Sequence, residues 1–144
     1  MTQINPITET DIPDVVRMIH ALAAHHGDSA AVTEDDLRRD ALGSSPWLRV
    51  LVAEGVGYAA LCPLAQLQFG VRGMDLHHIF VVEAARGLGV GGALINASIA
   101  CAKGEGARFL TVGTHPDNLS AQDIYRAAGF EEFGAGGVRF RMKW

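Results

Sequence analysis

Four glycines lie close together between an apolar stretch and a predicted helix, at Gly87, Gly89, Gly91 and Gly92. Glycine lets the backbone turn tightly and lets a ligand approach the main chain. The first N–H groups of a helix have no partner within it, and the helix dipole is positive at that end. The segment therefore predicts a site for a phosphate or pyrophosphate group.

Three of these glycines, Gly87, Gly89 and Gly92, spell the G-x-G-x-x-G pattern of dinucleotide-binding folds. Those folds carry the pattern in their first strand–helix–strand unit, whereas this chain ends too soon after it to complete a doubly wound sheet. Asp117 follows the next predicted strand, where such folds carry an acid, so nicotinamide binding stays open. The Gly-Lys-Ser/Thr element of nucleoside-triphosphate loops is absent from the sequence.

Two neighbouring histidines, His77 and His78, occupy a predicted strand over residues 74–82. A neutral imidazole can accept a proton from an incoming nucleophile near pH 7. Neighbouring strand residues face opposite sides of a sheet, so regular geometry points only one of the two into a site. The six histidines show no H-E-x-x-H or Cys/His spacing, so we expect no metal site.

Two motifs in the chain match one family. Arg86, Gly89 and Gly91 fit R/Q-x-x-G-x-G/A, and the segment NLSAQDIYRAAGF fits N-x-x-A-x-x-x-Y-x-x-x-G-F. The second motif falls on Asn118, Ala121, Tyr125, Gly129 and Phe130. The chain therefore resembles the GCN5-related N-acetyltransferases (GNAT). Residues 32–54, with the helix before them, resemble the diamine acetyltransferases, a subgroup that includes spermidine/spermine and thialysine acetyltransferases.

This resemblance implies that acetyl-CoA is the co-substrate, and that its acetyl group moves directly to a primary amine in a ternary complex. The amine would belong to a small molecule, namely a diamine, a polyamine or an amino-acid-like compound. Tyr125 would protonate or hydrogen-bond the departing sulfur, and the main chain of Ile79 and Val81 would contact the pantetheine arm. The residues expected to contact acetyl-CoA are Ile79, Phe80, Val81, Arg86, Gly87, Leu88, Gly89, Val90, Gly91, Gly92, Asn118 and Tyr125.

The predicted acceptor site departs from that subgroup, because His77 and His78 stand where the diamine enzymes carry a glutamate and an aspartate. We predict that His77 is the catalytic base, that His78 contributes less, and that both contact the substrate. The resemblance also implies a bulge in this strand, which could exchange the two roles. His26 and Asp28 lie in a stretch that borders the acceptor site in the relatives, so they are further expected substrate contacts. Losing two carboxylates weakens the polyamine interpretation, since a polycation requires an acidic channel.

Other functions stay open at this point. The missing glutamate is compatible with a non-catalytic module that binds and senses acyl-CoA, whereas an intact Tyr125 favours catalysis. An acetyltransferase that acts on a protein or peptide amine is a further alternative.

Composition limits the class of protein. The chain has 144 residues and a net charge of −4, which predicts one domain over residues 1–144 and no nucleic-acid groove. No apolar run approaches the roughly 20 residues that span a membrane, and no signal peptide is apparent. Cys62 and Cys101 lie in apolar surroundings, which predicts buried free thiols and a cytoplasmic location.

Hydrophobic periodicity predicts an α/β fold, and the resemblance makes it a GNAT-type mixed, mostly antiparallel sheet flanked by helices. Helices are predicted over 10–27, 33–43, 89–103 and 118–130, the last with Ser120 as a candidate N-cap. Strands are predicted over 4–7, 47–54, 57–64, 74–82, 108–114 and 137–144. The last strand alternates apolar and basic residues, and the related diamine enzymes pair through their C-terminal strands, so we expect a homodimer.

Overall fold

The computed structural model describes residues 2–134 and 136–144. Its contacts divide the chain into two compact units, Met1–Gly113 and Thr114–Trp144. The first unit holds the whole sheet and three of the helices, and the second holds the last helix and the C-terminal segment.

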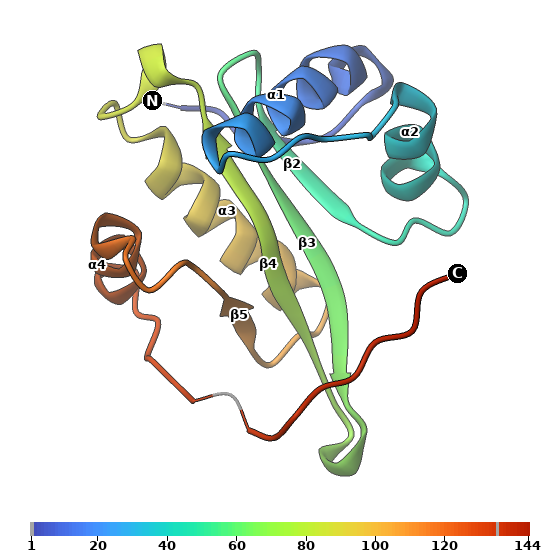
Figure 1. The fold of residues 1–144 in the computed structure, drawn as a ribbon, viewed down its shortest axis with the longest axis vertical. Coiled ribbons are helices and arrows are strands. Elements are labelled where there is room, and N and C mark those ends of the chain that lie inside the picture. Colours follow the sequence, from blue (N-terminus) through green and yellow to red (C-terminus); the bar gives the residue numbers. More distant parts are fainter. Residues whose placement is uncertain (1, 135) are drawn as a thin grey trace. The chain divides into compact units, whose positions relative to one another are not determined.

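The first unit is built on a five-stranded sheet in the order β1-β2-β3-β4-β5 (Figure 1). The strands are β1 (Asn5–Pro6), β2 (Arg49–Ala53), β3 (Gly57–Gln66), β4 (Val71–Val81) and β5 (Leu110–Val112). The first four strands pair antiparallel, and β5 runs parallel to β4. This architecture confirms the predicted α/β class with a mostly antiparallel sheet.

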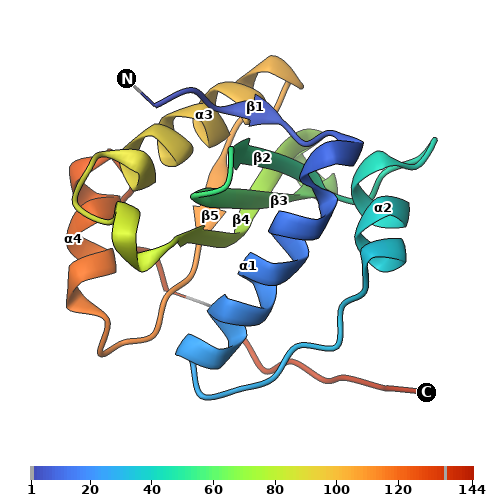
Figure 2. The ribbon, with the colours of Figure 1, turned by 90° about the horizontal axis from the view of Figure 1, so that it is seen from above.

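Side-chain alternation along the strands separates the core into two apolar layers. Tyr58 and Phe80 pack towards α1 (Ile12–His25) and α2 (Glu34–Leu42), whereas Ala59 and Leu61 pack towards α3 (Val90–Gly104). Figure 2 shows the sheet lying between α1 and α3. The helices thereby cover both faces of the sheet and hold β4 in place, the strand that leads into the glycine segment.

The start of α2 has a local cause in the sequence. Thr33 is its N-cap, and its hydroxyl accepts a hydrogen bond from the Asp36 N–H, while the Asp36 carboxylate accepts one from the Thr33 N–H. Such a reciprocal pair stabilises a helix start by about 1 kcal/mol. The acidic residues at 34–36 thus stabilise the N-terminus of α2.

The second unit contains α4 (Leu119–Ala127). Asn118 is its N-cap and accepts a hydrogen bond from the Ala121 N–H, so the predicted cap at Ser120 is wrong. The helix ends at Ala127, three residues before the end of the predicted range, and Gly129 follows its C-cap with a φ of 100°, a value that favours glycine.

The predicted C-terminal strand over 137–144 is not formed in the described chain. A strand is stable only when neighbouring strands supply its hydrogen-bond partners, and the described residues show none paired with this segment. Its alternating apolar side chains are 82% to 105% exposed, namely Val138, Phe140, Met142 and Trp144.

Candidate active site

The glycine segment forms an exposed turn that leads directly into α3. Gly87 and Gly89 have φ values of 78° and 86°, in the left-handed region that other residues rarely adopt. Gly89 is the N-cap of α3, and no side chain caps this helix start. The N–H groups of the first turn therefore point outward with the positive end of the helix dipole.

Space for a ligand is present on this turn. A Cβ atom added to Gly89 or Gly92 would meet no protein atom within 4 Å, and one added to Gly91 would meet only the Val81 side chain, at 4.0 Å. The glycines are therefore not required by packing against the protein. Their small size leaves the main chain accessible, which fits a pyrophosphate group.

Arg86 folds back onto the end of β4. Its Nε–H donates to the Val81 carbonyl oxygen at 3.0 Å, and its guanidinium lies 5.8 Å from the centre of the Phe80 ring. This residue was predicted as an acetyl-CoA contact. The structure shows a local role for it, since its contacts connect the glycine turn to the strand before it.

The edge of β4 next to β5 is open over its last residues. Pairing with β5 covers only Met74 to Leu76, while β4 continues to Val81. The Val82 N–H donates to the Val56 carbonyl, so main-chain groups at even-numbered positions face β3 in this stretch. Those of Ile79 and Val81 consequently face the open edge, where an extended ligand could bind them.

A β-bulge interrupts β4 at the histidine pair. Ala60 pairs with His78 and Leu61 pairs with Leu76, so His77 is an extra residue opposite no partner. The two imidazole rings stack with centroids 4.4 Å apart and planes at 13°. The regular alternation that would turn only one of these side chains towards the site does not hold here, because the bulge puts two successive residues on one face.

A buried tyrosine supports the second histidine. The Tyr58 hydroxyl lies 3.1 Å from Nδ1 of His78, and Tyr58 is fully buried. Burial, and then the charges of His77 and His26, lower the pKa of His78, so this imidazole is neutral at pH 7. Sequence reasoning missed Tyr58, because only the strand register reveals that it reaches His78.

The other predicted acceptor contacts lie at the end of α1. His26 is the exposed C-cap of α1, and it lies near enough to influence the pKa of His78. Asp28 is exposed in the following turn, where its carboxylate accepts the Ser29 N–H at 2.8 Å. Within the described residues, no three or more His, Cys, Asp or Glu side chains form a group that could hold a metal ion.

Two predicted site residues belong to the second unit. The Tyr125 ring packs edge-on against Phe130 at 5.9 Å, and burial raises the pKa of the Tyr125 hydroxyl above its ordinary value. The carboxamide oxygen of Asn118 caps α4. The N-x-x-A-x-x-x-Y motif thus has a clear local function, in which its first residue starts the helix that carries the tyrosine.

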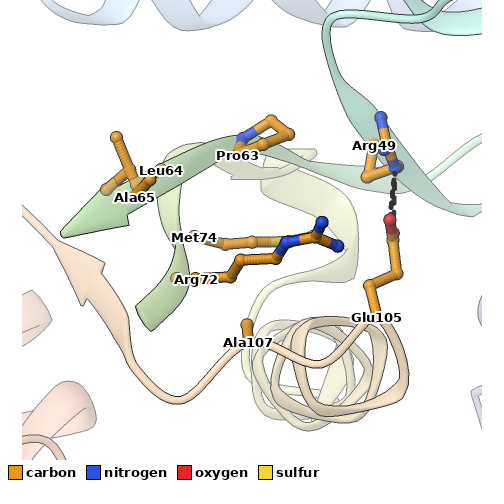
Figure 3. Close-up of a pocket in the computed structure, with 9 residues that line it drawn as sticks. Arg49, Pro63, Leu64, Ala65, Arg72, Met74, Glu105 and Ala107 are labelled. Atoms are coloured by element: carbon orange, nitrogen blue, oxygen red, sulfur yellow. Dashed lines mark hydrogen bonds and ion pairs between the residues drawn. The ribbon is translucent and has the colours of Figure 1, made fainter. Parts of the chain in front are cut away.

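A separate hollow of about 400 Å³ lies at the opposite end of β4 from the glycine turn (Figure 3). Its lining includes Pro63, Arg72 and Met74, together with an ion pair between Arg49 and Glu105 at 2.9 Å. The hollow contains none of the residues predicted to carry the chemistry.

An open strand edge that leads into glycines at a helix N-terminus is a suitable shape for an extended, phosphate-bearing ligand. The chain belongs to the acetyltransferase (GNAT) family, whose model matches residues 16–130. It is therefore an acyltransferase of the N-acetyltransferase type. The match confirms the predicted superfamily.

Individual relatives agree with the family. A thialysine N-epsilon-acetyltransferase from Bos taurus is 28% identical over 138 residues, which cover 86% of this chain and 81% of the relative. A mycothiol acetyltransferase from Cellulomonas flavigena is 33% identical and covers 81% of this chain, but only 37% of that longer protein. These similarities support the predicted thialysine-acetyltransferase-like subgroup.

Solved structures share the fold. A probable acetyltransferase superposes with a TM-score of 0.83 at 19% identity, covering 98% of this chain and 99% of that one.

In the part of the chain that the structure describes, no helix is long and apolar enough to cross a membrane.

Proposed function

We propose that this chain transfers the acetyl group of acetyl-CoA to a primary amine of a small molecule. The observation that carries the proposal is the continuity of β4, which leads from two imidazoles along an open edge into an exposed glycine turn. The main-chain N–H groups at the start of α3 would bind the pyrophosphate. The main-chain groups of Ile79 and the Val81 N–H would hold the pantetheine arm as an added strand, while the Val81 carbonyl accepts from Arg86.

Each residue would then have a defined task. Bound acetyl-CoA would supply the acetyl group as a thioester. His77 would accept the proton that the amine loses as its new N–C bond forms. Tyr125 would donate a hydrogen bond to the sulfur as the C–S bond breaks, and the raised pKa of its hydroxyl keeps that donor protonated.

The direct test is a panel of amines incubated with acetyl-CoA, with release of the CoA thiol as the readout. The panel contains diamines, polyamines, thialysine, amino acids, aminoglycosides and peptides. Acetylation of a small amine supports the proposal. Binding of acetyl-CoA without turnover of any amine would instead support a non-catalytic sensing module, and turnover of peptides alone would support a protein acetyltransferase.

The role of His77 predicts a pH dependence. A base must be neutral, so kcat/KM should rise with pH as the imidazole loses its proton. His77→Gln should remove this rise and lower kcat/KM at pH 7, while the affinity for acetyl-CoA stays the same. Higher pH should partly rescue the variant, because more of the amine is then neutral in solution. An unchanged pH–rate profile in His77→Gln would rule out this base.

A homodimer is a further part of the proposal. The apolar side chains of 138–144 are exposed on alternate positions, and a second copy could pair with this segment as a strand. Analytical ultracentrifugation at micromolar concentration should show twice the 15.3 kDa of one chain. Phe140→Ser should shift the equilibrium to monomer, and Arg141→Ser on the alternate face should not. A wild-type protein that sediments only as a monomer would contradict the dimer.

The cytoplasmic location also stays a prediction. It is supported by two free thiols, Cys62 and Cys101, which are half-buried where full burial was expected.

A further inference from the structure

We propose that Tyr58 is a positioning residue that fixes His78 as a hydrogen-bond donor to the acceptor, which leaves His77 as the imidazole that takes the proton. The inference rests on the proposed function, because it assigns separate tasks to two histidines of that site. It begins from the buried contact between the Tyr58 hydroxyl and Nδ1 of His78.

The buried hydroxyl decides which nitrogen of His78 carries the proton. Tyr58 is fully buried, and among the described residues Nδ1 of His78 is the partner recorded for its hydroxyl. A buried O–H hydrogen requires an acceptor, so Tyr58 must donate to an unprotonated Nδ1. Neutral His78 then carries its hydrogen on Nε2. The reverse arrangement leaves the hydroxyl hydrogen unpaired, which disfavours it by roughly ten- to a hundredfold.

This tautomer is suited to donation and unsuited to base catalysis. A general base must offer an unprotonated nitrogen to the amine, and here the unprotonated nitrogen faces the protein interior. The ionisable groups around His78 are Tyr58 from β3, His77 beside it on β4, and His26 at the end of α1. None of these is a carboxylate that would stabilise an imidazolium, so the neutral donor form persists at pH 7.

His77 has the complementary properties. It is exposed, it stacks on His78, and no hydrogen bond of its ring is recorded in the described chain. Both of its tautomers are therefore accessible, and it can present an unprotonated nitrogen to the amine. The bulge places the two imidazoles side by side, so one substrate molecule can meet a donor and a base together.

The Nε2–H donor of His78 restricts the chemistry of the amine substrate. An Nε2–H pairs with an oxygen atom of the substrate, such as a hydroxyl, carbonyl or carboxylate oxygen. A polyamine at neutral pH presents only N–H donors, which cannot satisfy this group. We therefore expect the acceptor to carry an oxygen within reach of its reactive amine.

The tautomer can be measured without any substrate. In protein labelled with ¹⁵N-histidine, long-range ¹H–¹⁵N spectra distinguish protonated from unprotonated ring nitrogens, and His78→Gln identifies the His78 signals by their loss. We expect Nε2 to be protonated and Nδ1 unprotonated at pH 7.5. His20 is an internal control, because its Nε2 lies 3.0 Å from the Val32 carbonyl, which can only accept. A wild-type His78 protonated on Nδ1 would overturn the proposal.

The variant Tyr58→Phe tests whether the Tyr58 hydroxyl fixes the tautomer of His78. The ring keeps its packing, and the loss of one neutral hydrogen bond should lower kcat/KM roughly 3- to 10-fold and allow the other tautomer of His78. Circular dichroism and thermal melting establish that the variant is folded. A folded Tyr58→Phe with an unchanged tautomer, or with a changed tautomer and full activity, would overturn the role.

Variants at His78 separate donation from proton transfer. His78→Gln retains an N–H donor and should keep much of the activity, whereas His78→Leu should lose at least about 10-fold, a factor that one hydrogen bond supplies. The acid-side fall in the pH profile should persist in His78→Gln and disappear in His77→Gln. The opposite assignment would show that His78 is the base.

A matched pair of acceptors completes the test. Lysine and 1,5-diaminopentane share the same aminoalkyl chain, and only lysine carries a carboxylate. Wild-type protein should prefer lysine, and His78→Leu should reduce that preference. Turnover of both without preference would contradict the donor while leaving the acetyltransferase proposal intact. If neither this pair nor the wider panel is acetylated, the proposed function fails, and the tautomer still decides the role of Tyr58.

Discussion

Gly91→Val should weaken acetyl-CoA binding by on the order of 100-fold or more, which corresponds to about 2.7 kcal/mol. Gly91 lies in the first turn of α3, where a Cβ meets only a methyl group of Val81, at 4.0 Å. A valine there would occupy the space of a ligand on the helix N-terminus, whereas its Cβ makes only an ordinary van der Waals contact with the protein. Isothermal titration with acetyl-CoA measures the loss, and thermal melting should show a protein that remains folded.

Gly89→Val should also abolish binding, but it carries a backbone penalty that needs a control. Gly89 has a φ of 86°, and Gly106, at the other end of α3, has a φ of 84° with equally open surroundings. Gly106→Val therefore imposes the same strain away from the predicted pyrophosphate site. We expect Gly106→Val to lower stability and leave acetyl-CoA affinity unchanged. Unchanged affinity in folded Gly91→Val would show that the phosphates bind elsewhere.

Much of the fold could be predicted from the sequence because its signals are local. Period-two and period-3.6 patterns located the central strands and all four helices. Gly27 and Gly129 marked helix ends through positive φ values, as the structure confirms. The cap of α4 was misassigned to Ser120, because Asn and Ser are nearly equal capping residues and stand two positions apart.

The arrangement of the candidate site was less predictable, because it depends on the register between β3 and β4. The family resemblance implies a bulge in this strand, but no residue in the HHIF segment fixes its position at His77. Tyr58 lies twenty positions before His78, and its buried hydroxyl becomes relevant only when that register is known. The glycine turn could be located from the motifs because it is one continuous stretch of backbone, and its role in phosphate binding stays a prediction.

The C-terminal segment shows a different limit of prediction from sequence. Alternation at 138–144 is typical of a strand, but a pattern of side chains cannot supply hydrogen-bond partners to the backbone. Over the described residues this segment has no strand partner. Pairing with a second copy stays a prediction, which the dimer experiment above tests.

Tyr125→Phe should lower kcat by on the order of 10- to 1000-fold and leave acetyl-CoA affinity nearly unchanged. Burial raises the pKa of Tyr125, whereas a free thiol has a pKa near 8.5, so complete proton transfer from the tyrosine to the sulfur is unfavourable. We therefore expect Tyr125 to donate a hydrogen bond to the sulfur as its negative charge develops. Such an interaction strengthens in the transition state, so its loss lowers kcat more than binding.

The variant isolates the hydroxyl, because phenylalanine preserves the edge-on packing against Phe130. Phe130→Leu serves as the control for that packing and should affect stability more than kcat. Since the raised pKa keeps Tyr125 protonated, wild-type activity should show no fall from its ionisation below about pH 10, the ordinary tyrosine value. Steady-state rates with a saturating amine, combined with titration of acetyl-CoA, measure both quantities. Full kcat in folded Tyr125→Phe would remove this hydroxyl from the mechanism and require another donor for the departing sulfur.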